Sequence, residues 1–313
     1  MDIDHIRQIS VVGSGLIGHS IALDFAIQGY KVRLHSHTKD SLKRSYDMIK
    51  NSMRNLVRLD CLDPNKMADI ESNIYMDSSL NASIIGSDIV IEAVYEKVIL
   101  KQKLFRRLDE MCPPHVILAS STSSILPSKL VEFVTRPERV VVAHYINPPH
   151  LVPLVEIVRS PLTSDLTVDT LYSLLKKLGK CPIILPQELP GFISGRLQMV
   201  VLKEALWLVK NGYASTKDVD TVLKSSLGRR WAVAGIFEVL ELAGWDLISN
   251  VISEIAPSID TSSESFSLID TKVKQGELGA KSGKGFYDWP EAVADSVREK
   301  IIHSLVEIEK WSE

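Results

Sequence analysis

The first part of the chain alternates short apolar runs with longer segments whose apolar residues recur at helical spacing. Ile9–Val12 is an apolar run before a glycine turn, and Leu16–Gln28 then repeats apolar residues three and four positions apart. Gly29 fits the C′ glycine that ends such a helix, and Val32–His35 is the next strand-like run. This order predicts a βαβ unit at the start of the chain.

The same alternation continues to about residue 186. Polar-faced helices are expected from Asp40 to about Leu59 and from Lys101 to the pair Pro113 and Pro114. Further apolar runs predict strands at Ser87–Val94, after Val116, after Arg139, at Pro153–Val158 and at Cys181–Pro186. Strands that alternate with helices predict a doubly wound, mostly parallel sheet covered by helices on both faces.

The pattern changes near residue 190. From Gly191 onward long helical patterns dominate, as in SGRLQMVVLKEALWLVKNGY and GIFEVLELAGWDLISNVISEI. We therefore place a domain boundary at Leu189–Pro190. Residues 1–189 are predicted to form an α/β domain and residues 190–313 an all-α domain.

Composition narrows the class of protein. The chain has 313 residues, a net charge of -3 and no long basic run, so a nucleic-acid surface is not expected. Its three cysteines are far apart without a CxxC pair, which disfavours both a disulfide framework and a metal site. No apolar run approaches the ~20 residues of a membrane span, and the first residues lack the pattern of a signal peptide. A cytoplasmic protein is expected.

The glycine turn GSGLIG has the form GxGxxG between a predicted strand and a predicted helix. In such a turn Gly13 permits tight folding, Gly15 lets the backbone approach a pyrophosphate, and Gly18 lets helix and strand pack closely. Leu16 and Ile17 lie at the helix N-terminus, whose free N–H groups attract phosphate. The α/β domain is therefore predicted to be a Rossmann-type domain that binds a dinucleotide.

The second strand ends without the acid that usually holds the adenosine ribose of NAD. Ser36 occupies that position, and His37, Thr38 and Lys39 follow it. Sites for NADP replace the acid with small or polar residues and nearby cations that receive the 2′-phosphate. We favour NADP over NAD on this basis. Two alternatives stay open: Ser36 could bond the ribose of NAD directly, or no dinucleotide binds.

His144 and Glu156 form a second candidate site. His144 follows the strand RVVVA at its carboxyl end, the edge of an α/β sheet where ligands bind, and Glu156 lies inside the apolar run PLVEIV. A carboxylate in such a run needs a partner, and an imidazole held by it becomes a stronger base. The alternative is a capping histidine and an unrelated exposed glutamate.

The chain resembles a known family along nearly its whole length. The stretches GSGLIG, EAVYEK, SSTSSILP, HYINP, PLVEIV, PGFISGRL, GIFEVLELAGWD and KSGKGFYDW occur in the order seen in the L-3-hydroxyacyl-CoA dehydrogenases. SILPSKL and LGRRW are most similar to the branch with lambda-crystallin (L-gulonate 3-dehydrogenase) and carnitine dehydrogenase, which use free hydroxy acids. The resemblance implies oxidation of a 3-hydroxyl to a 3-ketone and a homodimer formed through the helical domain.

The resemblance also implies roles for individual residues. His144 would be the general base and acid, and Glu156 would orient it. Ser123 would bond the substrate oxygen and Asn147 would lie near the nicotinamide. Glu96 and Lys101 would line the cofactor site.

Two positions concern the substrate. Gly195 stands where the family usually has an asparagine, which suggests either a changed substrate or weakened catalysis; we favour the changed substrate. Arg230 matches a position where hydroxy-acid relatives carry an arginine that can hold a carboxylate through two hydrogen bonds. Alternatively, Arg229 and Arg230 are a solvated pair at a helix end.

The sequence thus predicts an NAD(P)-dependent 3-hydroxyacyl-CoA or 3-hydroxy acid dehydrogenase with a small-molecule substrate and no metal. Two rival hypotheses remain. One is a non-catalytic dinucleotide-binding protein of the same fold. The other is an oxidoreductase that acts on an amine or imine, which HxxNP and the downstream glutamate disfavour.

Overall fold

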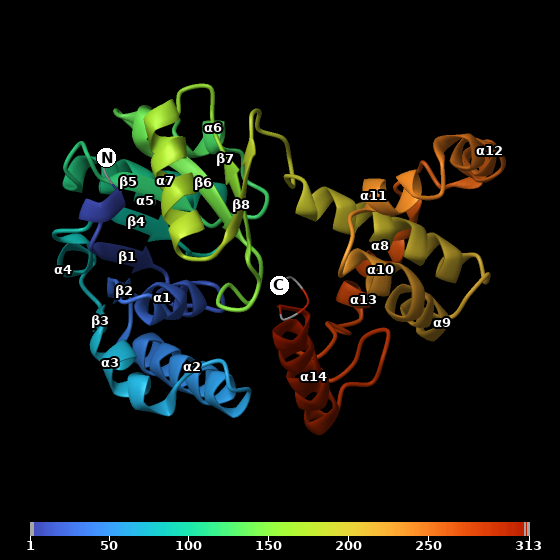
Figure 1. Cartoon of the computed structure of the whole chain (residues 1–313), viewed down its shortest axis with the longest axis horizontal. Helices are drawn as coiled ribbons and strands as arrows, with labels where there is room; N and C mark the ends of the chain where they lie inside the picture. The colour runs from blue at the N-terminus through green and yellow to red at the C-terminus, as the bar shows by residue number, and fades with distance from the viewer. Residues whose placement is uncertain (1–2, 310, 312–313) are drawn as a thin grey trace. The chain divides into compact units, whose positions relative to one another are not determined.

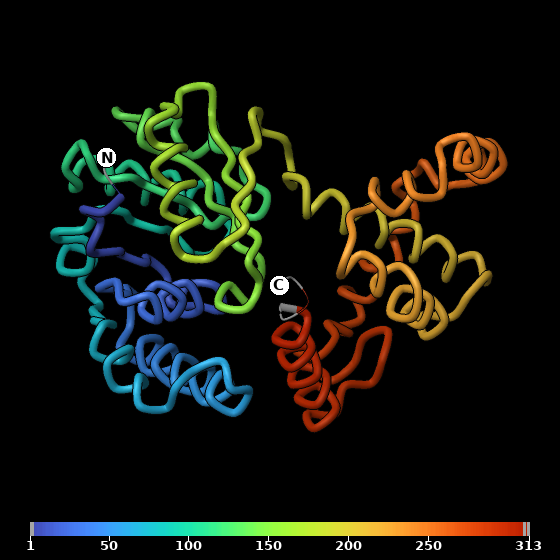
Figure 2. Tube along the Cα trace, in the orientation of Figure 1, coloured from blue at the N-terminus to red at the C-terminus, as the bar shows by residue number. Residues whose placement is uncertain are grey.

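The structure, a computed structural model, describes residues 3–309 and 311. The chain divides into two compact units, Met1–Arg196 and Leu197–Glu313. Figure 1 shows the sheet in the first unit and helices throughout the second. The chain passes between the units once, along helix α8 (Ser194–Lys210), as the trace in Figure 2 shows. The domain boundary predicted at Leu189–Pro190 lies shortly before this helix.

The first unit is built on an eight-stranded sheet with the order β3-β2-β1-β4-β5-β6-β7-β8. All pairings are parallel except that of β6 with β7. The strands are β1 (Gln8–Val12), β2 (Lys31–His35), β3 (Ile74–Asp77), β4 (Ile89–Glu92), β5 (Ile117–Ser120), β6 (Val140–Tyr145), β7 (Leu154–Val158) and β8 (Cys181–Leu185). The predicted doubly wound, mostly parallel sheet is confirmed. Strand β3 was not predicted, because its four residues at the sheet edge, three half-buried and one exposed, carry little apolar pattern.

Helices cover both faces of this sheet and then make up the second unit. The helices of the first unit are α1 (Gly18–Ile27), α2 (Lys39–Arg58), α3 (Met67–Ser72), α4 (Leu80–Ile84), α5 (Val98–Met111), α6 (Pro127–Leu130) and α7 (Asp165–Lys177). Those after α8 are α9 (Thr216–Val222), α10 (Gly228–Trp231), α11 (Ile236–Glu241), α12 (Trp245–Ile255), α13 (Ser267–Lys274) and α14 (Glu291–Glu309). The predicted helical C-terminal domain is confirmed. None of the helices described is long and apolar enough to cross a membrane.

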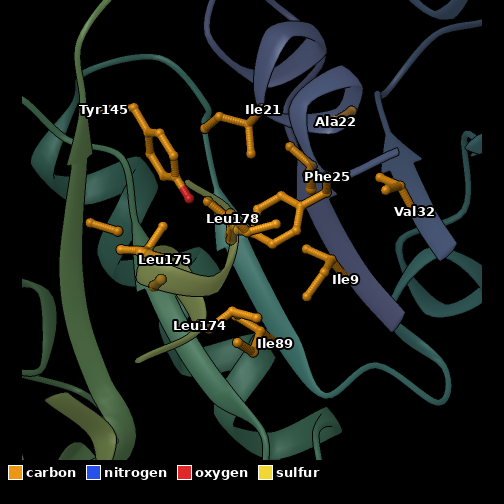
Figure 3. Close-up of a cluster of buried hydrophobic side chains, with 14 of the residues drawn as sticks. Ile9, Ile21, Ala22, Phe25, Val32, Ile89, Tyr145, Leu174, Leu175 and Leu178 are labelled. Atoms are coloured by element: carbon orange, nitrogen blue, oxygen red, sulfur yellow. The ribbon is translucent and has the colours of Figure 1, made fainter. Parts of the chain in front are cut away.

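Two apolar layers hold the sheet between its helices. One layer joins the sheet to α1, α2 and α7, and Figure 3 shows part of it, with Phe25 of α1 among Leu174, Leu175 and Leu178. The other layer joins the opposite face to α4, α5 and α6. Because strand residues alternate between faces, Tyr145 enters the first layer and its neighbour His144 points to the second.

The strand order places a ligand crevice. From β1 the chain proceeds to β2 and β3 on one side, and the later strands lie on the other side, beginning with β4. At such a switch point the loops that leave the two central strands diverge, which opens a crevice at their carboxyl ends. The glycine turn follows β1 at this point.

Candidate active site

The glycine turn is shaped by contacts that only glycine permits. Gly13 has a φ of 112°, and a Cβ there would lie 2.3 Å from the carbonyl oxygen of Ala93. A Cβ on Gly18 would lie 1.8 Å from the carbonyl oxygen of Gly13. At Gly15, in contrast, a Cβ would meet no atom within 4 Å, so this face of the turn is free for a pyrophosphate.

A cavity of about 770 Å³ lies against this turn at the carboxyl ends of the central strands. It brings together most of the predicted cofactor residues: the turn from Gly13 to Ile17, Ser36 and His37, and Glu96 and Lys101. Ser123 lines the same cavity. Gly18, Lys39 and Asn147 are not among the residues that line it. The geometry of the turn and the cavity fits a bound dinucleotide.

The wall of the cavity near Ser36 contains a cation that the sequence analysis missed. Arg44 of α2 lines the cavity and donates a hydrogen bond from Nη2 to Ser41 Oγ at 2.9 Å. Asp47, from the same helix, also lines it. Ser41, Arg44 and Met48 follow one another at helical spacing, and this periodicity beside the second strand is the signal that could have identified Arg44.

A second cavity of about 470 Å³ shares His35 and His37 with the first. Lys103 and Arg107 of α5 also line it. The cavity that Ser36 lines thus contains the imidazole of His37 and the guanidinium of Arg44 together with the carboxylate of Asp47, and Lys103 and Arg107 lie in the adjoining cavity.

A buried carboxylate, Glu92, supports the floor of the site and was not predicted. Its Oε1 accepts a hydrogen bond from Lys101 Nζ at 2.6 Å, and its Oε2 accepts one from Ser120 Oγ at 2.6 Å. Burial raises the pKa of Glu92, and the ammonium of Lys101 opposes this effect. Glu92 ends the apolar strand β4, and an acid in such a run is the sequence signal for a buried cationic partner.

Glu96 is held in place by the loop that carries Ser123. Its Oε1 accepts hydrogen bonds from Thr122 Oγ1 at 2.5 Å and from Ser123 N at 3.1 Å, and Lys101 Nζ lies 3.4 Å from its Oε2. Burial alone would raise the pKa of Glu96, but the bond from Thr122 and the charge of Lys101 lower it. Lys101 therefore joins Glu92 below the cavity to Glu96 at its wall.

His144 and Glu156 are cross-strand neighbours. They are paired in the antiparallel register of β6 and β7, which explains how residues twelve positions apart in the sequence meet on one face of the sheet. His144 Nδ1 lies 2.7 Å from Glu156 Oε2, and both side chains are buried. Because a carboxylate only accepts hydrogen bonds, Nδ1 carries the proton and Nε2 is left free to act as a base.

Glu156 also receives hydrogen bonds from the start of α8. Ile193 N and Ser194 N donate to Oε1 at 3.0 and 2.9 Å, and Ser194 Oγ donates to Oε2 at 2.6 Å. Burial alone would raise the pKa of Glu156, but the bonds from His144 and Ser194 lower it to about 2. The carboxylate is therefore ionised at neutral pH and can stabilise an imidazolium. Phe192 packs on the imidazole, with ring centroids 5.4 Å apart.

The remaining predicted residues lie at the edges of the first unit or in the second. Asn147 is exposed in the loop directly after β6. Gly195 lies in the first turn of α8, where glycine costs less than in a helix interior. Arg230 is exposed in the last turn of α10, in the second unit, so its role toward the substrate stays a prediction. No cluster of side chains that could hold a metal occurs among the described residues.

Family models match both parts of the chain. The model described as 3-hydroxyacyl-CoA dehydrogenase, NAD binding domain, matches residues 8–189, and the model for the C-terminal domain matches residues 191–289. The chain belongs to the 3-hydroxyacyl-CoA dehydrogenase family. The resemblance seen in the sequence is confirmed, and so are the dehydrogenase activity on a 3-hydroxyacyl-CoA or 3-hydroxy acid and the NAD class of cofactor. The family match does not support a non-catalytic protein.

Relatives in the family cover most of the chain. The Homo sapiens lambda-crystallin homolog is 34% identical over 242 residues, which are 77% of this chain and 76% of that protein. The mitochondrial hydroxyacyl-coenzyme A dehydrogenase of Rattus norvegicus is 35% identical over 292 residues, 91% of each chain. The 5-formyl-3-hydroxy-2-methylpyridine 4-carboxylate 5-dehydrogenase of Mesorhizobium japonicum is 28% identical over 305 residues, 97% of this chain and 98% of that protein.

Solved structures agree with this family membership. A structure described as an NAD+ dependent dismutase with that same 5-dehydrogenase activity has a TM-score of 0.91 at 27% identity, covering 97% of this chain and 98% of that one. The (S)-3-hydroxybutyryl-CoA dehydrogenase of Ralstonia eutropha has a TM-score of 0.74 at 29% identity, covering 91% and 100%.

Proposed function

We propose that His144 is the general base of a dehydrogenase that oxidises a 3-hydroxy acid or its coenzyme A thioester. A dinucleotide held at the glycine turn from Gly13 to Ile17 would supply the acceptor for the hydride that leaves C3. His144 Nε2 takes the hydroxyl proton in oxidation and returns it in reduction. Ser123 bonds the substrate oxygen, and Glu156 stabilises the imidazolium, since a fixed opposite charge favours the protonated ring.

The observation that carries this proposal is the contact of 2.7 Å between His144 Nδ1 and Glu156 Oε2. It fixes the tautomer that leaves Nε2 unprotonated, as a general base requires. The test is His144→Ala, assayed on a set of 3-hydroxy acids, their thioesters and the matching ketones. We expect wild-type turnover on at least one of them and a loss of about 10²- to 10⁴-fold in the variant. Equal turnover in both proteins would refute the role of His144.

For the cofactor we propose NADP in preference to NAD. Ser36 leaves room where an acid would repel a phosphate, and His37 and Arg44 line the same cavity. Lys103 and Arg107 add positive charge at the adjoining cavity. Arginine suits a 2′-phosphate because its planar donors can bind two oxygens at once.

Titration of NADPH and NADH by fluorescence tests this preference. We expect tighter NADPH binding in the unmodified protein, and a reversed order in Ser36→Asp, because the new carboxylate would repel the 2′-phosphate and accept bonds from the ribose. NADH binding that is tighter by tenfold, about 1.4 kcal/mol, in the unmodified protein would refute the preference. The role proposed for Arg44 is tested by the same titration of Arg44→Ala. Its control is Arg54→Ala, because Arg54 also belongs to α2 but does not line the cavity.

For the substrate we propose a free acid held by Arg230. The Mesorhizobium relative has a carboxylate in the name of its substrate, and the stretch LGRRW of this chain carries the resemblance to the hydroxy-acid branch of the family. Gly195 leaves open space at its Cβ position, with no atom within 4 Å, which fits a substrate bulkier than one that contacts an asparagine there.

Arg230→Ala should lose turnover on small free acids and retain it on thioesters. Its neighbour Arg229, also exposed in α10, is the matched control. If Arg230→Ala and Arg229→Ala show the same relative turnover on free acids and thioesters, Arg230 does not hold the substrate carboxylate. Gly195→Asn has room for its side chain and should narrow the substrate range toward smaller substrates.

We also propose a homodimer formed through the helical unit, in the cytoplasm. Large apolar side chains are exposed on α8 and α12, including Leu197, Val200, Leu247 and Ile252, each at least half exposed. Such a surface supports a partner copy. Light scattering should give twice the mass of 34.9 kDa, and a monomer at micromolar concentration would contradict the proposal.

A further inference from the structure

A buried polar cluster lies away from the catalytic pair, between α1 and the loop after β6. Asp24 of α1 forms an ion pair with Lys180, with 2.8 Å between Oδ1 and Nζ, and both side chains are less than 10% exposed. Such a pair carries a large desolvation cost and is weak evidence for a role in stability. The amino-acid sequence around Asp24, LDFA, is otherwise apolar. The cluster therefore calls for another explanation.

Lys180 has a second contact, on the loop that carries Asn147. Its Nζ donates a hydrogen bond to the carbonyl oxygen of Pro149 at 2.7 Å. This loop joins β6 to β7, the two strands that present His144 and Glu156. Lys180 therefore links the main chain of the loop to a fixed charge on α1.

The same loop is attached to α1 at a second point. His150 Nδ1 lies 2.5 Å from Ser20 Oγ, and the next residue towards the glycine turn, His19, bonds through Nδ1 to the carbonyl oxygen of Gly15 at 2.8 Å. Burial lowers the pKa of His150 to about 4, helped by His19 and Lys180, so this ring is neutral at pH 7. A series of contacts thus runs from the glycine turn along α1 to the loop.

The pair is not arranged for stability alone. Oδ2 of Asp24 and the hydroxyl of Tyr145 are buried without a hydrogen-bond partner among the described residues. Burial raises the pKa of Asp24 to about 6, against the opposing charge of Lys180. An apolar pair of similar volume would avoid these costs, whereas it could not hold the carbonyl of Pro149.

We propose that Lys180 is a positioning residue of the dehydrogenase reaction. It holds the loop of Asn147 at a fixed distance from α1, and so fixes the nicotinamide side of the site relative to the pyrophosphate side. This inference rests on the proposed function, in which His144, in the strand that leads into the same loop, is the general base; the family resemblance implies that Asn147 lies near the nicotinamide. Hydride transfer is sensitive to such placement, since a displacement of about 1 Å can cost about 10²-fold in rate.

A double-mutant cycle separates positioning from stability. The variants are Lys180→Met, Asp24→Asn and the double variant, and the control is Lys177→Met, which removes the exposed ion pair of Lys177 with Asp4. For each protein the melting temperature, kcat and the KM for the dinucleotide are measured. Hydrogen exchange is measured without cofactor or substrate at the loop residues that carry an N–H group, which are Ile146, Asn147, His150, Leu151 and Val152.

We expect kcat to depend on the presence of Lys180. The melting temperature should depend on whether the charges of Asp24 and Lys180 are both present or both absent. Lys180→Met leaves Asp24 buried without its partner, so both the melting temperature and kcat fall, kcat by about tenfold or more. The double variant removes both charges, so its melting temperature recovers while kcat stays low and the loop still exchanges faster. The KM for the dinucleotide should change less than about threefold, because the glycine turn is intact. Lys177→Met should match the unmodified protein.

Recovery of kcat together with the melting temperature in the double variant would show a purely structural role and overturn the proposal. A folded Lys180→Met protein with unchanged loop exchange would overturn it as well. If that variant does not fold, the double variant decides, because it has no buried unpaired charge; loop exchange and kcat equal to those of the unmodified protein there would overturn the proposal. An inactive unmodified protein would refute the proposed function, whereas the exchange measurement would still decide whether Lys180 holds the loop.

Discussion

Replacing Glu156 with glutamine should disable His144 while keeping the shape of the site. In the unmodified protein Oε1 accepts two backbone N–H groups, and Oε2 accepts His144 Nδ1 and the hydroxyl of Ser194. Glutamine has a single acceptor oxygen. Backbone donors cannot change their role, and leaving both unpaired would cost about 1–3 kcal/mol each. The amide oxygen of the glutamine therefore accepts the backbone N–H groups of Ile193 and Ser194, and its NH₂ group faces Nδ1 of His144.

This orientation changes the tautomer of His144. Nδ1 must now accept a hydrogen bond, so the proton moves to Nε2, which can no longer take a proton from the substrate. We expect kcat for oxidation to fall by about 10²- to 10⁴-fold, the usual contribution of a general base. Stability should fall too: a pKa lowered from 4.5 to about 2 corresponds to about 3 kcal/mol in favour of the ionised carboxyl.

The assay follows the absorbance of the reduced nicotinamide for the unmodified protein, His144→Ala and Glu156→Gln. Glu188 is a suitable control, because its carboxylate also accepts a backbone N–H, that of Ser128 at 2.8 Å, without a histidine. Glu188→Gln should retain full turnover. If Glu156→Gln keeps kcat within about threefold of the unmodified protein, the reasoning about the tautomer is wrong.

Three further predictions follow from the contacts of the first unit. Folding lowers the pKa of Glu156, so the contribution of this carboxylate to stability is complete above pH 4.5 and is lost as the pH falls towards 2. The difference in stability between the unmodified protein and Glu156→Gln should therefore shrink over this range, and a constant difference in acid unfolding would contradict this. Gly15→Ala should keep the melting temperature of the unmodified protein and weaken dinucleotide binding at least about tenfold. Gly18→Ala should melt at a lower temperature, because its Cβ would lie 1.8 Å from a carbonyl oxygen, and equal melting temperatures of the two variants would count against this account of the turn. Lys101→Met leaves Glu92 buried without its ammonium and should lower the free energy of unfolding by about 3–5 kcal/mol in denaturant titration; a loss below about 1 kcal/mol would show that the pair is not needed.

Local patterns were sufficient to predict the architecture. The glycine turn between an apolar strand and a helix, and the alternation of apolar runs with helical segments, depend on neighbours along the chain. The pairing of strands does not depend on neighbours along the chain, and in sequence the antiparallel strand β7 cannot be told from a parallel one. The meeting of His144 and Glu156 in one register was therefore a hypothesis from spacing, which the structure places at hydrogen-bond distance.

Contacts between distant segments could not be predicted in the same way. Asp24 and Lys180 belong to elements at opposite ends of the first unit's sequence, and nothing local relates them. A carboxylate within an apolar helix still indicates that some buried partner exists, as it did for Glu156. Arg44 could not be predicted from the residues directly after the strand, because it lies one helical turn further along, on the face of α2 that begins at Ser41 and lines the cavity.

The two departures from the family pattern, Ser36 and Gly195, leave the contact between His144 and Glu156 in place. Ser36 lies at the end of β2 in the cofactor cavity, on the side of the proposed adenosine ribose. Gly195 lies in the first turn of α8, and its neighbour Ser194 donates two hydrogen bonds to Glu156. A chain that had lost catalysis would have no need to keep a buried carboxylate with four donors, because such a group is costly without a function. The intact pair therefore favours a changed substrate and cofactor as the reason for both departures.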